Sequence, residues 1–172
     1  LYAPGHHVGA SYSPTELADT ARDLLRLAGP PPCKLFLPID IVVAEKLAPG
    51  APARVRDIGH VDEDERILDA GPETVERLCR AMANSKTLVW NGPLGVFEMP
   101  PFDKGTLEAA RCAAGLAKSG KLVAVAGGGD TVAALNAAGV VDDFTFVSTA
   151  GGAFLEWMEG KTLPGVAALS RN

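Results

Sequence analysis

Cysteine and histidine are scarce in this sequence, and the few that are present show no metal-ligand spacing. There are three of each: Cys33, Cys79, Cys112, His6, His7 and His60. An odd number of widely spaced cysteines argues against a disulfide framework or a zinc site and fits a reducing cytosol. We therefore expect a cytoplasmic protein.

An excess of positive charge and a long apolar run are also absent. The formal net charge is -5 and the pI is near 5.2, so the electrostatic footprint of a nucleic-acid partner is missing. No apolar run approaches membrane-spanning length and no signal peptide is visible, so we expect no membrane partner. What is present, 172 residues of which 47% are hydrophobic, is enough for one domain with a sizeable core. The first residue is Leu1 rather than Met, which indicates a fragment.

One glycine-rich stretch, KLVAVAGGGDT (121–131), organises the second half of the chain. Its apolar part predicts a strand that is buried on both faces. The three glycines let backbone N–H groups approach a ligand closely, and Asp130 stands where a helix N-cap is expected. The free amides and the positive dipole end of that helix favour an anion. The alternative is a tight strand-to-helix turn that binds nothing.

The surrounding sequence alternates between predicted helices and strands. Helices are predicted from Pro72, from Asp103 and over 130–138 and 153–159, and strands over 87–90, 122–126 and 143–147. This alternation is typical of a parallel sheet with helices on both faces. The sequence therefore predicts an α/β fold, a three-layer αβα arrangement with a mostly parallel, Rossmann-like sheet.

The first half of the chain is less regular. A helix is predicted to begin around Ser13, with Pro14 at the first helical position and Glu16 completing a capping box. Residues 33–37 have the pattern of a strand and 40–44 that of an extended segment. Turn residues and a short acidic run predict that 46–71 is irregular.

Three loops follow the predicted strands: 91–98, 127–131 and 148–152. Ligands of open α/β sheets bind at the carboxyl ends of the strands, so these loops are expected to converge on a site. Their polar residues are neutral or acidic: Asn91, Glu98, Asp130, Thr131, Ser148 and Thr149. Glycine amides combined with an acidic residue indicate phosphates delivered with Mg²⁺. Glu98 can accept hydrogen bonds from ribose hydroxyls or be an exposed loop acid.

Three other functional patterns fail. A dinucleotide fingerprint beginning at Gly127 needs glycine where Val132 stands, which disfavours a Rossmann dehydrogenase. Residues 115–121 match the first seven positions of a P-loop, but Leu122 replaces its Ser or Thr and the segment precedes its strand. No histidine accompanies Ser148 or Thr149, so a Ser-His-Asp hydrolase has little support.

Several segments resemble phosphoglycerate kinases. They are VWNGPLGVFE (89–98), AVAGGGDTVAAL (124–135) and VSTAGGAFLEWMEGKTLPGVAAL (147–169), together with LPIDIVVAEK (37–46) and DAGPETVE (69–76). The resemblance covers essentially the whole chain, with the motifs in family order. It corresponds to the nucleotide-binding, C-terminal domain of that family, and not to all of it.

The resemblance implies reversible phosphoryl transfer between 1,3-bisphosphoglycerate and MgADP, giving 3-phosphoglycerate and MgATP in glycolysis. It implies that Asp130 accompanies the Mg²⁺ of ADP or ATP, that Glu98 holds the ribose, and that Gly151 and Gly152 face the transferring phosphoryl group. The other nucleotide-binding residues that it implies are Asn91, Pro93, Gly127, Gly128, Gly129 and Thr131. Such chemistry mainly requires positioning and charge stabilisation.

Two departures from the family pattern stand out. Ala150 replaces a frequent glycine, and its methyl group limits φ. The family's N-terminal domain, which grips phosphoglycerate, and the lysine-bearing opening of its nucleotide domain are not among residues 1–172. The resemblance thus implies a partial C-terminal domain that reaches phosphoglycerate only through the missing domain, and a monomer when full-length. We expect no appreciable turnover by this chain alone.

Two other interpretations stay open. The chain can be a stand-alone nucleotide-binding module without catalysis, as the glycine loops and the lack of a visible acceptor site would allow. It can also be a structural remnant that binds nothing, as the truncation and Ala150 would allow.

Overall fold

The computed structural model describes residues 1–13, 15–28, 33–148 and 150–169. The chain divides into two units, which we call unit 1 and unit 2. Unit 1 comprises Leu1–Arg80 and Leu94–Ala109, and unit 2 comprises Ala81–Pro93 and Ala110–Asn172. Pro14, predicted at a helix start, lies outside the described residues, and so does Thr149.

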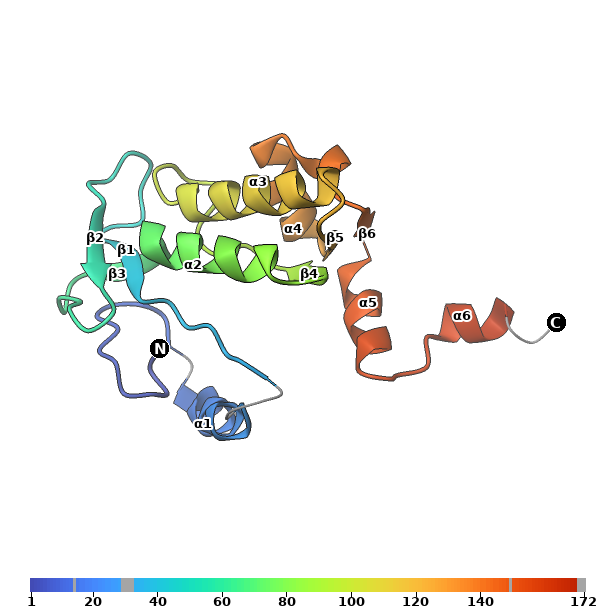
Figure 1. The fold of residues 1–172 in the computed structure, drawn as a ribbon. Helices are drawn as coiled ribbons and strands as arrows, with labels where there is room; N and C mark the ends of the chain where they lie inside the picture. The colour runs from blue at the N-terminus through green and yellow to red at the C-terminus, as the bar shows by residue number, and fades with distance from the viewer. Residues whose placement is uncertain (14, 29–32, 149, 170–172) are drawn as a thin grey trace. The chain divides into compact units, whose positions relative to one another are not determined.

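Unit 1 is built on a small antiparallel sheet, in the strand order β2-β1-β3 (Figure 1). The strands are β1 (Asp40–Ala44), β2 (Arg54–Asp57) and β3 (Arg66–Ala70). In the register of the sheet, Asp40 lies opposite Asp57, and Val42 lies opposite Asp69. One face buries Ile41 and Val43 with Val61, and a second cluster joins Ala44, Leu68 and Phe102.

Three expectations for this part of the chain need correction. Residues 46–71 contain two strands, because β2 and β3 pair with β1 rather than forming loops. Residues 33–37 are not a strand: they are exposed and have no sheet partner among the described residues, so no ladder forms. The first α-helix, α1 (Ala18–Leu27), begins late, after the 3-10 turn η1 (Thr15–Leu17). Its N-cap is Leu17, which makes no side-chain cap hydrogen bond.

Two helices contain residues of both units. Helix α2 (Pro72–Ala83) begins one residue after Gly71, as predicted, with proline at its first position. Helix α3 (Lys104–Lys118) begins directly after Asp103 and ends in a turn where Gly120 has a φ of 69°. The amides of Gly120 and Lys121 donate to the carbonyl oxygens of Ala117 and Leu116, which satisfies the helix end.

Unit 2 contains the parallel sheet, in the strand order β4-β5-β6. The strands are β4 (Thr87–Asn91), β5 (Val123–Gly127) and β6 (Phe146–Ser148). Asn91 lies opposite Gly127, and Gly127 lies opposite Ser148, so the three strands end at one edge. The parallel α/β arrangement predicted for this part is thereby confirmed.

Two helices of unit 2 each follow a strand, as the alternation predicted, and a third, which was not predicted, follows the second without a strand between them. They are α4 (Gly129–Ala138), α5 (Gly151–Met158) and α6 (Pro164–Leu169), with the 3-10 turn η2 (Val141–Asp143) before β6. The core uses small side chains: Ala124, Ala126 and, on α3, Ala110 and Ala113 are fully buried. Within the described ranges, no helix combines the length and the apolar character that crossing a membrane requires.

Candidate functional site

The turn after β5 is the first part of the site in unit 2. Gly128 has a φ of 104°, a backbone conformation that favours glycine, and it is the N-cap of α4. Asp130 is therefore not the N-cap that the sequence predicted, because the N-cap lies two residues earlier, at Gly128, and the helix begins at Gly129. Asp130 lies in the first turn with an exposed side chain. The first amides of α4 have no intrahelical acceptor and Gly128 has no side chain to supply one.

The turn after β6 packs directly against the first. The amide of Gly128 donates to the carbonyl oxygen of Ser148 at 3.1 Å. A Cβ placed on Gly151 would lie only 2.4 Å from the Cα of Gly128 and 2.6 Å from its nitrogen. Gly151 is buried for this reason, whereas Gly152 is exposed and a Cβ there would meet nothing within 4 Å. The predicted convergence of the loops 127–131 and 148–152 is confirmed.

The first residues of the loop after β4 belong to the same cluster. The amide of Gly92 donates to Thr131 Oγ1 at 2.7 Å, and Trp90 Nε1 donates to the carbonyl oxygen of Gly92 at 2.6 Å. The peptide groups of Gly92 are thus held from both sides. Thr131 is buried, with 1% of its surface exposed. A Cβ on Gly128 would lie 3.5 Å from Asn91 Oδ1, so Asn91 also borders the first glycine turn.

Glu98 belongs to unit 1, whereas the glycine turns, Asn91 and Pro93 belong to unit 2. Its side chain is exposed, and it follows the buried Phe97. The predicted contact of Glu98 with a ribose stays a prediction, as do the ligand contacts of the other predicted residues.

Asp130 is the residue that can hold a metal in this cluster. The described residues contain no group of three or more His, Cys, Asp or Glu side chains arranged around a metal position. Mg²⁺ is commonly held by one or two carboxylates together with substrate phosphates and water, rather than by an all-protein cage. A single exposed carboxylate in the first turn of α4 therefore fits a magnesium ion that arrives on a nucleotide.

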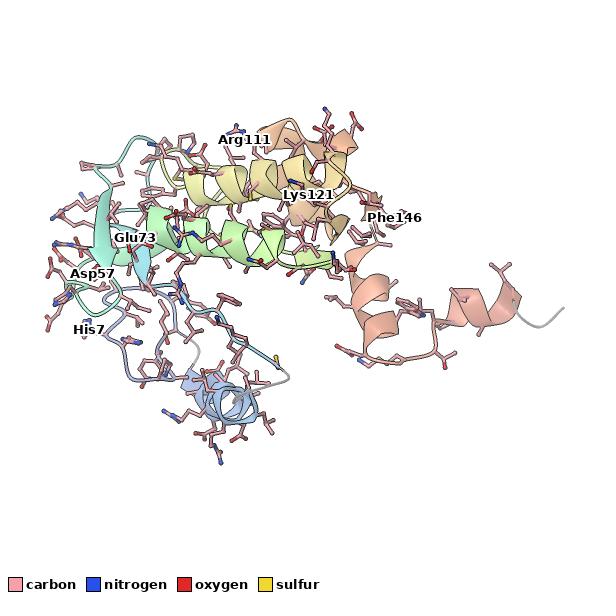
Figure 2. The ribbon with its side chains drawn as sticks, viewed as in Figure 1. His7, Asp57, Glu73, Arg111, Lys121 and Phe146 are labelled. Carbon is pink, nitrogen blue, oxygen red and sulfur yellow. The ribbon has the colours of Figure 1, made fainter. Side chains whose placement is uncertain are left out.

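Buried polar residues in unit 1 were missed by the sequence analysis. Asp40 is 4% exposed and accepts the amides of Glu73 and Thr74 at 2.9 and 2.7 Å, and the Thr74 hydroxyl at 2.6 Å. Glu73, labelled in Figure 2, lies in the first turn of α2. Asp40 therefore caps α2 from a strand that lies more than 30 residues away in the sequence.

Asp69 performs the corresponding task for α3. It is 2% exposed, and its Oδ2 accepts the amide of Gly105 at 2.7 Å while its Oδ1 accepts its own neighbour's amide, that of Ala70, at 2.8 Å. Burial raises the pKa of Asp69 to about 6, opposed by the two amide hydrogen bonds and assisted by the charge of Asp103. The sequence does place an aspartate in each of these two apolar strand segments, and a buried carboxylate needs a hydrogen-bond donor. It does not reveal which helix supplies the donor.

Unit 1 also contains an apolar cavity of about 490 Å³, which is within the range of small-molecule sites. Its polar lining includes Asp69, Thr74 and Arg77. Its apolar lining includes Phe36, Leu37, Leu68, Leu78, Leu94 and Val96. This cavity could not be predicted from the sequence, because its walls come from five separate segments of the chain.

The parallel strands of unit 2 end at two adjoining glycine turns, each of which leads into a helix. This arrangement defines an α/β protein that presents helix N-termini at the carboxyl edge of a parallel sheet. The model of the phosphoglycerate kinase family matches residues 1–161. The chain therefore belongs to the phosphoglycerate kinase family.

Individual relatives agree with this assignment. The chain is 66% identical over 169 residues to a phosphoglycerate kinase of Caulobacter vibrioides and 60% identical to one of Dinoroseobacter shibae. Each alignment covers 98% of this chain and 43% of the relative. The solved structure of phosphoglycerate kinase from Coxiella burnetii matches with a TM-score of 0.92 at 40% identity, over 99% of this chain and 43% of that one. The chain thus spans less than half the length of these relatives.

Proposed function

We propose that this chain forms the nucleotide-phosphate part of a phosphoglycerate kinase. In the full-length protein, the phosphoryl group passes reversibly from the acyl phosphate of 1,3-bisphosphoglycerate to the terminal phosphate of MgADP, giving 3-phosphoglycerate and MgATP. The observation that carries the proposal is the contact between the two glycine turns, Gly151 on Gly128. It brings the N-termini of α4 and α5 side by side, where their amides can receive adjacent phosphates.

Each helix N-terminus has its own part in this proposal. Gly127, Gly128 and Gly129 leave the backbone before α4 open to the nucleotide phosphates. Gly151 and Gly152 direct the start of α5 toward the transferring phosphoryl group, where amides stabilise developing charge. A bound Mg²⁺ supplies charge neutralisation for the phosphates, and Asp130 is the residue that would hold it.

The remaining predicted residues shape and extend the site. Thr131 accepts the amide of Gly92, so it fixes the loop in which Asn91 and Pro93 lie beside the phosphates. Glu98 accepts hydrogen bonds from the ribose hydroxyls. Neither role needs a covalent nucleophile, which agrees with the positional character of phosphoryl transfer.

We further propose that the chain is a partial C-terminal domain that binds MgADP but has no appreciable turnover alone. The phosphoglycerate site would be on the N-terminal domain of the full-length protein, which would act as a cytoplasmic monomer. A stand-alone nucleotide-binding module is the second candidate, favoured by the two adjoining glycine turns in unit 2.

Two measurements test the proposal. The first is a calorimetric titration of the folded chain with MgADP, for which we expect saturable binding at one site. The second is a coupled assay of ATP formation from 1,3-bisphosphoglycerate, without and with the N-terminal portion of a family member added. Recovery of turnover on addition supports the kinase, and binding that never acquires turnover supports the module. Substantial turnover by the chain alone would refute the fragment proposal.

A further inference from the structure

The segment that carries Glu98 is held by two buried side chains, Thr106 and Asp69, neither of which has a part in the proposed phosphoryl transfer. We call residues 94–98 the ribose loop, a name that rests on the proposed function of Glu98. We infer that Thr106 and Asp69 are positioning residues that fix the conformation of the ribose loop and so place Glu98. All of the contacts that carry this inference lie within unit 1.

Thr106 holds the beginning of the ribose loop. Its side chain is fully buried, and its Oγ1 accepts the amides of Leu94 at 3.0 Å and of Gly95 at 3.2 Å. One hydroxyl oxygen therefore satisfies two consecutive backbone donors. Without it, both amides would be left in a partly buried position with no equivalent acceptor, which is unfavourable for this conformation.

Asp69 closes the other side of the same loop. A Cβ on Gly95 would lie 2.3 Å from Asp69 Oδ1 and 2.7 Å from the Asp69 Cα, so the loop backbone lies directly against this residue. Gly105 approaches the same carboxyl group, with a Cβ position 2.6 Å from Oδ1, and its amide donates to Oδ2. Asp69 thus joins the ribose loop, strand β3 and the first turn of α3.

The end of the ribose loop is fixed by contacts that depend on the position of Gly95 against Asp69. The amide of Val96 donates to the carbonyl oxygen of Leu68 at 2.9 Å, and Phe97 is buried with 8% of its surface exposed. Glu98 follows directly, with its side chain exposed. The direction in which Glu98 points is therefore set by the residues that precede it, and Thr106 and Asp69 contribute through their side chains.

The test uses a pair of variants that differ by the hydrogen-bond acceptor. Thr106→Val keeps the shape of the side chain and removes the acceptor, whereas Thr106→Ser keeps the acceptor. Amide hydrogen exchange of this chain should show the amides of Leu94, Gly95 and Val96 exchanging about tenfold faster in Thr106→Val, with Thr106→Ser close to the parent. Gly95→Ala should have the same local effect as Thr106→Val, because its Cβ displaces the loop from Asp69.

Binding of ADP and of 2′,3′-dideoxy-ADP gives the second readout. The dissociation constant of 2′,3′-dideoxy-ADP divided by that of ADP reports the contribution of the ribose hydroxyls. We expect Thr106→Val to lower this ratio toward the value of Glu98→Gln, about tenfold below the parent, and Thr106→Ser to retain it. A purely structural role would accelerate exchange throughout unit 1 without a local excess at 94–96 and would leave the ratio unchanged.

The outcomes separate this inference from the proposed function. If Glu98→Gln lowers the ratio but Thr106→Val changes neither the ratio nor the local exchange, the positioning role is refuted and the ribose role stands. If Glu98→Gln leaves the ratio unchanged, or ADP does not bind, the proposed role of Glu98 fails, and the exchange data decide the positioning role. Equal exchange at 94–96 in the valine, serine and parent chains would overturn it.

Discussion

Helices α2 and α3, which begin in unit 1, differ from helices α4 and α5 of unit 2 in whether a side chain accepts their N-terminal amides. In unit 1, a buried carboxylate from a strand occupies the amides: Asp40 for α2 and Asp69 for α3. In unit 2, α4 follows Gly128 and α5 follows Ala150, neither of which has a side-chain acceptor. A helix N-terminus that is satisfied internally cannot take a ligand anion, whereas one that is left open can.

The glycines of the two units also differ in what packs against them. In unit 1, Gly71, Gly95 and Gly105 leave room for the carboxyl groups of Asp40 and Asp69. In unit 2, Gly151 leaves room for the backbone of a second glycine turn. The N-terminal amides of α2 and α3 are therefore satisfied within the protein, whereas those of α4 and α5 are left open for a ligand.

Removal of the Asp40 carboxylate should have the largest effect, on stability. Asp40→Ala leaves the amides of Glu73 and Thr74 without their acceptor, and we expect a loss of about 3 kcal/mol in the free energy of unfolding. Urea denaturation measures this loss. Asp57→Ala is the matched control, since Asp57 lies opposite Asp40 in the register but has a side chain that is 83% exposed. A similar loss in both variants would contradict the capping role.

The Asp69 carboxyl should make stability depend on pH. Its pKa is raised from 3.8 to about 6, so the folded chain retains a proton that the unfolded chain has lost. The free energy of unfolding should therefore fall as pH rises from about 4 to 6, by about 2 kcal/mol after allowance for solvent screening. Asp69→Asn should lack this contribution. Parallel pH profiles for the variant and the parent, measured by urea denaturation, would contradict the shift.

Glu65 should contribute with the opposite sign. Burial alone would raise its pKa, but the hydrogen bond from Arg56, the amide of Asp62 and the charges of Arg56 and Arg54 outweigh burial and lower the pKa. Its stabilising contribution is therefore complete above the unfolded value of 4.5 and is lost as pH falls below it. Glu65→Gln should flatten the acid side of the denaturation profile, whereas Asp69→Asn should flatten the profile between pH 4 and 6.

The contact between the glycine turns should affect ligand binding. Gly151→Ala places a methyl group 2.4 Å from the Gly128 Cα, so the turns must separate, and we expect the affinity for MgADP to fall about tenfold or more. Calorimetric titration measures the change. Gly115→Ala is the control, because a Cβ there meets nothing within 4 Å. Unchanged affinity in Gly151→Ala would show that the phosphates do not use the junction of the turns.

The smallest effect is expected from Asp130, which acts through a metal ion. Asp130→Ala should weaken MgADP binding several-fold and leave metal-free ADP binding unchanged or slightly improved, since a negative charge near the phosphates is removed. Titrations with Mg²⁺ and with a chelator compare the two conditions. Because Gly128 rather than Asp130 is the N-cap, an equal loss in both conditions would indicate a direct contact between Asp130 and the nucleotide.

The glycine turns of unit 2 were predictable because their signals are local. A buried apolar strand, a run of glycines and an apolar helix follow one another within residues 121–135, and parallel pairing then brings the strand ends together. The assignment of Asp130 as N-cap failed because Gly128 takes the positive φ and starts the helix early. This two-residue shift of the N-cap is not encoded in the composition of the turn.

The capping contacts of Asp40 and Asp69 in unit 1 were not predictable, because each joins segments that are far apart in the sequence. Asp40 meets Thr74, and Asp69 meets Gly105, only after the antiparallel sheet has formed. The sheet itself was missed since β2 is exposed, with the pattern RVRD, and gives no alternating apolar signal.

Hydrogen exchange with and without MgADP tests the division between open and closed helix N-termini most directly. The account predicts protection by MgADP of the amides at 129–131 and 151–153, and no change at Glu73, Thr74 and Gly105, whose acceptors lie within the protein. Two results would contradict this prediction. In one, MgADP protects none of the amides at 129–131 and 151–153 of the folded chain. In the other, it protects the amides of Glu73, Thr74 and Gly105 as strongly as those at 129–131 and 151–153.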